Sequence, residues 1–266
     1  ATMAAQTGDQ ALVRAAAGRL AESRPHSGWA RFGVASLLGE DQRDAQLVEL
    51  TAAIALDPRI LPAHSERARL LALAGDWDAA LAACDPPIYA GHPPVQLRGR
   101  AAWIVYQRGE PNAAIAAMQV LAIEDPSYAF TWVCLGDWAQ AYGRNDAAAD
   151  AYRQLLRHHP DMIHVAVALF DLELGLGARF EAGRTIARMR SAGADDQADL
   201  AELRLVLARD GQHTALQRFA QKACDPSVAA WVLPAALNAF AALCEPEVVQ
   251  ACLAELVARS DAHASV

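Results

Sequence analysis

Glycine recurs along this chain at a fixed spacing of 34 residues, at Gly75, Gly109, Gly143, Gly177 and Gly211. Glycine makes up 16 of the 266 residues, so four further matches after a first one are expected by chance in roughly one sequence in 10⁵. A repeat of this period is typical of proteins built from one supersecondary unit that is copied along the chain. The sequence therefore predicts several copies of one element of fixed length.

The residues between the glycines indicate that this element is a pair of helices. Apolar residues recur every three or four positions over 95–107 and again over 112–123. Glycine tolerates the positive φ that ends a first helix, and proline, which lacks an amide hydrogen, ends a second. Prolines keep the same period at Pro58, Pro126 and Pro160. We expect helical hairpins in which Asp76 or Asn145 caps the second helix.

The segment 132–160 carries the clearest signature, which consists of Trp132, Leu135, Gly136, Gly143, Ala148, Tyr152 and Pro160. This pattern of large and small residues resembles the tetratricopeptide repeat. Gly136 and Ala148 are the small residues that let two helices approach, and Trp132 and Tyr152 fill the adjoining gaps. The resemblance implies an all-α fold, a right-handed superhelical α-solenoid of about seven hairpins.

The match to the repeat varies along the chain. Residues 1–25 are expected to form an N-terminal helix that completes a partial repeat, 26–160 to form well-matched repeats, and 161–266 to form divergent repeats and C-terminal helices. Within the second of these regions, the pair Pro86-Pro87 should shorten one helix, and the stretch "IYAGHPP" that follows should form an irregular link.

Composition argues against several classes of function. The chain has 31 acidic and 23 basic residues, and a net charge of −8 would repel a phosphate backbone, so no nucleic-acid partner is expected. The sequence predicts neither a membrane span nor a secretory leader. Five scattered cysteines without zinc-site spacing favour a reducing, cytoplasmic location. A single lysine, Lys222, among the 23 basic residues indicates a GC-rich, bacterial genome.

Catalytic and metal-binding patterns are missing from the sequence. The histidine-rich stretch 158–164 straddles a predicted helix end, so nothing fixes its imidazoles on one face as a metal site requires. Gly33 and Gly136 do not belong to phosphate-binding loops. We therefore predict no catalytic residue, no metal and no cofactor.

The first helices of stacked hairpins line a concave groove in which partners usually bind. The predicted partner-binding residues are Arg69, Arg100, Trp103, Tyr106, Gln107, Phe130 and Asp137. Guanidinium groups beside flat aromatic rings suit an extended peptide that carries a carboxylate. The alternative interpretation is that Trp103 and Tyr106 only pack between repeats.

These features predict a non-catalytic scaffold that binds a protein or peptide. The alternative function is that of the substrate-recruiting region of a larger bacterial enzyme, of the glycosyltransferase or sulfotransferase type. The last predicted hairpin, which includes residues 235–243, has few charges, so polar residues do not cap its end. We expect a homodimer partner or an adjoining domain to cover it.

Overall fold

The computed structural model describes residues 15–16, 18–19, 23–24 and 26–264. The N-terminal helix predicted in 1–25 therefore lies largely outside the described residues. Within the described part, fourteen α-helices and two short 3₁₀ turns follow one another without a strand. The helices form seven successive hairpins, which confirms the predicted all-α repeat architecture.

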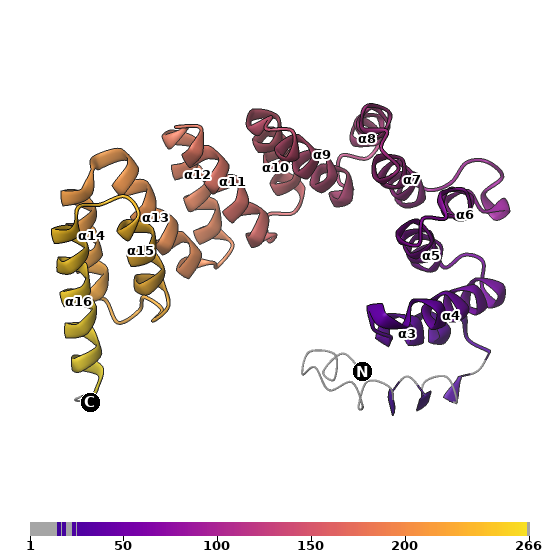
Figure 1. Cartoon of the computed structure of the whole chain (residues 1–266), viewed down its shortest axis with the longest axis horizontal. Helices are drawn as coiled ribbons and strands as arrows, with labels where there is room; N and C mark the ends of the chain where they lie inside the picture. The colour runs from indigo at the N-terminus through magenta and orange to yellow at the C-terminus, as the bar shows by residue number, and fades with distance from the viewer. Residues whose placement is uncertain (1–14, 17, 20–22, 25, 265–266) are drawn as a thin grey trace. The chain divides into compact units, whose positions relative to one another are not determined.

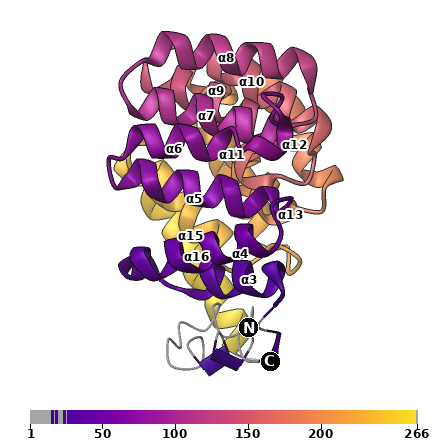
Figure 2. The ribbon, with the colours of Figure 1, turned by 90° about the vertical axis from the view of Figure 1, so that its right-hand side faces the viewer.

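The chain divides into two compact units, 1–134 and 135–266, and the division falls inside one helix. The first unit contains, in order, α3 (Gly28–Leu37), η1 (Glu40–Gln42), α4 (Arg43–Leu56), α5 (Leu61–Leu73), α6 (Trp77–Cys84), η2 (Pro87–Tyr89), α7 (Val95–Gln107), α8 (Pro111–Glu124) and the start of α9 (Ala129–Ala141). Within this unit each hairpin lies against the next (Figure 1), and Figure 2 shows them as successive layers.

The second unit contains the rest of α9, then α10 (Asn145–His158), α11 (Ile163–Gly175), α12 (Arg179–Ser191), α13 (Asp195–Asp210), α14 (Gln212–Ala223), α15 (Val232–Ala241) and α16 (Pro246–Ala264). Here α11 packs against α10, α12 and α13, and α13 packs in turn against α14 and α15. The predicted change from well-matched to divergent repeats after residue 160 concerns sequence match, and it stays a prediction.

The periodic glycines form one repeated backbone turn. Gly75, Gly109, Gly143 and Gly177 all have positive φ, between 68° and 99°. At each of them the amide of the following residue donates to a carbonyl five positions earlier, as Asp76 N does to Leu71 O at 3.0 Å. This bond satisfies a carbonyl that the end of the helix leaves without a partner. The 34-residue period therefore reflects the recurrence of one helix-ending motif.

The fifth glycine of the series makes a different turn. Gly211 has φ 84° and ψ 175°, and it is at once the last cap of α13 and the first cap of α14. A single residue thus connects these two helices. An additional turn of the usual kind occurs at Gly193, where Ala194 N donates to Met189 O at 2.9 Å. Glycine ends α12 there, in place of the proline that ends other second helices.

One of the two predicted caps is confirmed and the other is wrong. The side chain of Asp76 accepts a hydrogen bond from Ala79 N at 3.2 Å and so caps α6. At the corresponding place in the next unit the cap residue of α10 is Arg144, and Asn145 is already the first helical residue. Because Arg144 N bonds back to Ala139 O, the turn fixes Arg144 in the cap position.

The predicted close approach of two helices at Gly136 is present in the structure. A Cβ added to Gly136 would lie 2.3 Å from Cε1 of Tyr152, which is inside any van der Waals contact. Ala148 is completely buried, and the Tyr152 hydroxyl donates to the Asp137 carboxylate. Tyr152 therefore holds α9 and α10 together by shape and by a hydrogen bond.

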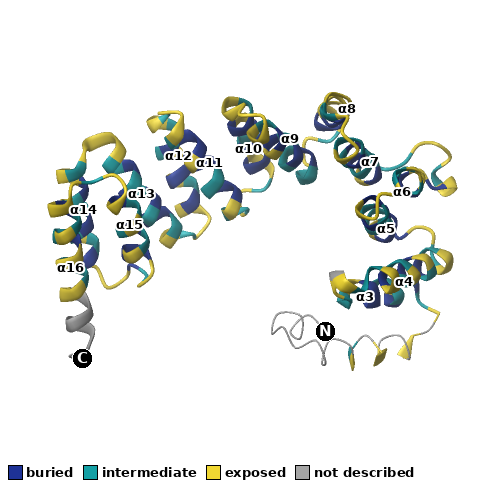
Figure 3. Ribbon diagram, in the orientation of Figure 1, coloured by how far each residue is buried: buried dark blue, intermediate teal, exposed yellow. Residues whose placement is uncertain are grey.

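Within each unit the apolar side chains are buried where hairpins face one another, and the turns are exposed (Figure 3). One cluster joins α3, α4 and α5 around Leu50 and Ile60, and another joins α5, α6 and α7 around Leu97 and Ile104. In the second unit, Phe219 and Phe240 lie in the cluster that joins α13 to α16. The predicted shortening at Pro86-Pro87 is also confirmed, since α6 ends at Cys84.

Candidate partner-binding site

A cavity of about 490 Å³ opens on the first helices of the first unit. Its wall is formed by Phe32, Ala35, Ser36, Gln46, Leu50, Pro62, Ser65, Glu66, Arg69 and Arg100. These residues come from α3, α4, α5 and α7. The volume lies within the range of about 300–1,000 Å³ that is common for ligand sites. Two of the predicted partner-binding residues, Arg69 and Arg100, thus lie in one cavity wall.

Arg100 is held in place by two aromatic rings. The central carbon of its guanidinium group lies 5.1 Å from the ring centroid of Trp103 and also 5.1 Å from that of Phe130. Its Nε donates to Ser65 Oγ at 3.1 Å. Within the described residues, its two terminal nitrogens make no hydrogen bond. The guanidinium group is therefore oriented before any ligand arrives, and it retains two nitrogens that can donate.

The backbone brings Phe130 to Arg100 because α7 has a glycine at the contact. A Cβ on Gly99 would lie 2.9 Å from Cε1 of Tyr128 and 3.5 Å from Cδ1 of Phe130. Burial lowers the pKa of the Arg100 guanidinium, and the nearby Glu66 carboxylate opposes this effect. Guanidinium groups stay protonated in proteins, so Arg100 remains a cation near neutral pH.

Arg69 differs from Arg100 because it already has a carboxylate partner. Its Nε lies 3.1 and 3.0 Å from the two oxygens of Glu66, and its Nη2 lies 2.7 Å from Oε1. This forked pair neutralises Arg69 within one turn of α5. A ligand carboxylate would have to compete with Glu66 for Arg69, whereas it could bind Arg100 directly.

Gln46 also lines this wall. Its Nε2 donates to Leu38 O at 2.9 Å and to Ala35 O at 3.4 Å, so both bonds fix the amide orientation. Its Oε1 is buried and has no hydrogen-bond partner within the described residues. A buried acceptor without a partner costs free energy.

The other predicted residues are distributed as follows. Trp103 and Phe130 contact Arg100, and Trp103 also packs on the core cluster around Ile104, so it combines both of the roles considered for it. Tyr106 and Gln107 lie further along α7 and are not part of the cavity wall. Asp137 lies in the second unit, where its carboxylate accepts from Tyr152.

Gln46 is not among the predicted residues, because it lies on a second helix, α4, whereas the predicted groove residues lie on first helices. The sequence around Gln46 only weakly indicates that this residue lines the cavity. A glutamine inside an amphipathic helix is usually read as surface, and only its burial, with 7 % of its surface exposed, marks it as part of a site.

A second cavity, of about 620 Å³, lies in the second unit between α12, α13 and α14. Its charged residues pair with one another. Asp199 lies 2.8 Å from both Arg190 Nη2 and Lys222 Nζ, and Glu202 pairs with Arg190, Arg218 and Lys222. Together, Arg218 and Lys222 help to hold the pKa of Glu202 below its ordinary value, although burial acts in the opposite direction. The charged side chains of this cavity therefore neutralise one another.

The described residues contain no group of three or more His, Cys, Asp and Glu side chains arranged to hold a metal ion. In the same part of the chain, no helix combines the length and the apolar character that crossing a bilayer requires.

No protein-family model matches the sequence, and no curated protein matches it. Solved structures of similar architecture include a tetratricopeptide repeat protein from Parabacteroides merdae (14 % identity, 91 % of this chain and 98 % of that one, TM-score 0.42). Another is PilW, a type IV pilus biogenesis factor (12 % identity, 74 % of this chain and 92 % of that one, TM-score 0.49). A third is YrrB, a repeat protein with an unusual peptide-binding site (14 % identity, 76 % of this chain and 96 % of that one, TM-score 0.38). At such identities the likeness concerns the fold alone.

Proposed function

We propose that this chain, a tetratricopeptide-repeat protein by its fold, is a non-catalytic interaction scaffold whose first unit binds a peptide segment of a partner protein. The observation that carries the proposal is the state of Arg100. Two aromatic rings and Ser65 hold its guanidinium group in the cavity wall, while both terminal nitrogens are available to a ligand. A cation oriented in this way stabilises a bound carboxylate without the entropy loss of a free side chain.

A peptide fits the cavity because Arg100 requires an acceptor, which a carboxylate of the peptide supplies. The apolar part of the wall includes Phe32, Leu50 and Pro62, so an aliphatic side chain next to the carboxylate would also be sheltered from water. We therefore expect a segment with a carboxylate beside an apolar residue.

Within the proposed set of contacts, Arg100, Trp103 and Phe130 form the anchor. Tyr106 and Gln107 would extend the contact along α7, and Asp137 is proposed as a separate contact in the second unit. Arg69 contributes less than Arg100, because Glu66 already occupies its donors.

The test compares peptides with free and amidated C-termini. Pools of short fluorescent peptides that end in an apolar residue are titrated with the wild-type protein, with Arg100→Gln and with Arg59→Gln, and binding is followed by anisotropy. Arg59 is the matched control, since it is exposed in the turn before α5 of the same unit. Loss of a hydrogen bond to a charged group, about 1.5–3 kcal/mol, corresponds to roughly 10- to 150-fold weaker binding.

The proposal requires that free-carboxylate peptides bind better than amidated ones and that Arg100→Gln alone removes the difference. Equal weakening by Arg59→Gln would reduce the effect to general electrostatics. Circular dichroism melting of each variant separates loss of binding from loss of folding. If no pool binds the wild-type protein, the cavity is not a peptide site.

Two further parts of the expected function remain proposals. Among the described residues the five cysteines form no disulfide, which supports a reducing, cytoplasmic setting. The alternative role is recruitment of substrate to an attached enzyme domain, and under that role the cavity would bind the same kind of segment. A reading frame that continues into such a domain would distinguish the two roles.

A further inference from the structure

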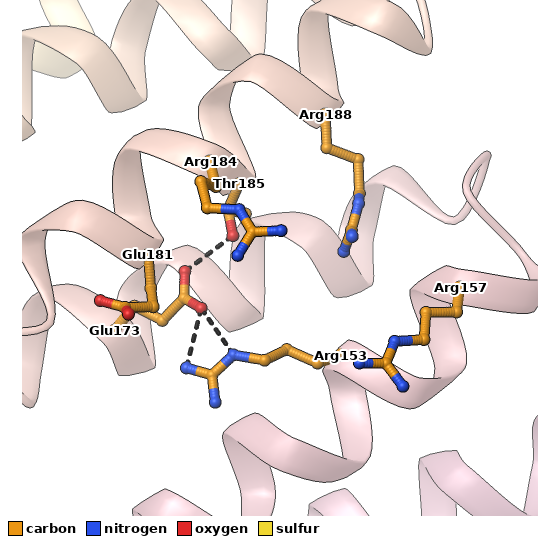
Figure 4. A pocket seen from close by; sticks show the side chains of 7 residues that line it. All are labelled: Arg153, Arg157, Glu173, Glu181, Arg184, Thr185 and Arg188. Carbon is orange, nitrogen blue, oxygen red and sulfur yellow. Dashed lines mark hydrogen bonds and ion pairs between the residues drawn. The ribbon is translucent and has the colours of Figure 1, made fainter.

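A third cavity, of about 210 Å³, lies in the second unit between α10, α11 and α12, and four arginines line it. Its wall consists of Arg153, Arg157, Glu173, Glu181, Arg184, Thr185 and Arg188. Figure 4 shows two of the arginines extending from α10 and two from α12, with Glu173 between the helices. This concentration of positive charge contrasts with the net charge of −8 of the whole chain.

One arginine is accounted for by the buried carboxylate. Glu173 has 1 % of its surface exposed, and both of its oxygens are satisfied. Arg153 Nε lies 3.0 Å from Oε1, and Thr185 Oγ1 donates to Oε2 at 2.7 Å. Arg153 also reaches Asp150, outside the cavity wall, at 2.8 Å. A buried carboxylate needs such a partner, so Arg153 has a structural role.

The remaining three arginines have no such explanation. Among the described residues, Arg157 donates only to the neutral side chain of Gln154, at 3.0 Å. Within the described residues, Arg184 and Arg188 form no side-chain hydrogen bond or ion pair. In the wall, only the Glu181 carboxylate remains to balance these three guanidinium groups, so an excess of two positive charges remains.

This arrangement of arginines is electrostatically unfavourable when no ligand is bound. Arg153 and Arg157 lie four residues apart on α10, and Arg184 and Arg188 lie four residues apart on α12, so each pair places like charges on one helix face. The two helices then direct both pairs at the same cavity (Figure 4). The cavity between α12, α13 and α14 differs, because its basic side chains all have carboxylate partners there. A bound anion would offset the repulsion.

We propose that this cavity binds a phosphate group. A phosphate monoester carries about −1.5 to −2 charges at neutral pH, which matches the excess of two. Guanidinium groups bind phosphate oxygens in forked pairs, and three of them can approach one group from two helices. The cavity is smaller than sites for drug-sized ligands, which favours a single anionic group over a peptide backbone. The proposal is independent of the peptide site in the first unit.

Calorimetric titrations test the proposal in phosphate-free buffer at about 0.15 M ionic strength. The probes are inorganic phosphate, a phosphoserine peptide and its unphosphorylated form. The test variant is Arg184→Gln/Arg188→Gln. The control is Arg59→Gln/Arg144→Gln, which removes the same charge from two exposed sites. We expect inorganic phosphate, the phosphoserine peptide or both to bind the wild-type and control proteins, and to bind the test variant at least tenfold more weakly.

Glu181→Gln should have the opposite effect on phosphate affinity. It removes the one carboxylate that would repel the ligand, so binding should tighten severalfold. Tighter binding of the phosphopeptide than of inorganic phosphate identifies a protein-borne group, and the reverse order identifies a free one. Without ligand, the Arg184→Gln/Arg188→Gln variant should melt no lower than wild type, since repulsion is removed. The proposal is wrong if neither phosphorylated probe binds, if the control weakens binding equally, or if a 20-nucleotide RNA binds more tightly than both probes.

Discussion

Gly136→Ala is expected to lower the free energy of unfolding by about 2–4 kcal/mol, although alanine is the better helix former. The new Cβ would lie 2.3 Å from Cε1 of Tyr152. The ring cannot move away at no cost, because its hydroxyl is hydrogen-bonded to Asp137. Overpacking costs about 1–3 kcal/mol, and loss of a hydrogen bond to a carboxylate costs about 1.5–3 kcal/mol. The gain in helix propensity, about 1 kcal/mol, offsets part of this.

Gly183→Ala is the matched control, since Gly183 also lies inside a helix of the second unit. There the nearest atom to an added Cβ is Leu205 Cδ2, at 3.9 Å, which is an ordinary contact. This variant should therefore gain about 0.5–1 kcal/mol from helix propensity and lower chain entropy in the unfolded state.

The assay is urea unfolding followed by circular dichroism, with hydrogen exchange of α9 and α10 to localise the effect. At about 2–4 °C per kcal/mol, Gly136→Ala should also lower the melting temperature by about 5–15 °C. If Gly136→Ala proves as stable as wild type, or if Gly183→Ala loses as much, the argument from the contact of Gly136 with Tyr152 is wrong.

Arg69→Gln should weaken binding of a carboxylate-bearing peptide less than threefold, whereas Arg100→Gln weakens it roughly 10- to 150-fold, and anisotropy titrations that show equal losses would reject the assignment of the anchor. Burial raises the pKa of the Cys84 thiol from 9.0 to about 12, so its contribution to stability is present below pH 9 and is lost as the pH rises toward 12. Urea unfolding across this window should show a flatter pH dependence for Cys84→Ala. Leu253 and Val257 are exposed on α16, so Leu253→Glu/Val257→Glu should convert a dimer into a monomer in light scattering, and a wild-type protein that is monomeric at every concentration would refute pairing through this end.

The fold was predictable because the residues that end its helices act through local backbone geometry. The apolar pattern over 95–107 coincides with α7, since the glycine turn fixes where a helix must end. Gly211 shows the limit of that reasoning. It occupies the periodic position, but its ψ of 175° sends the chain directly into α14. A residue type identifies a break but does not determine its geometry.

The cavities were less predictable because they combine side chains from distant positions. Arg100 and Trp103 share one helix and were found together, but Gln46 joins them only through the packing of α4 against α5. The arginines that face each other across the third cavity lie on two separate second helices. Composition, with its excess of acidic residues, pointed away from a basic cavity, because a net charge averages over all surfaces.

In four of the turns that follow a first helix, the closing hydrogen bond uses the backbone amide of the residue after the glycine. Those residues are Asp76, Glu110, Arg144 and Ala178, and their amides make the same bond in all four turns. Acidic, basic and apolar side chains thus all occur at one structural position. A fluorophore or an affinity handle attached at Arg144 or Ala178 would report on a chosen hairpin without removing the side-chain bonds that Asp76 and Glu110 make.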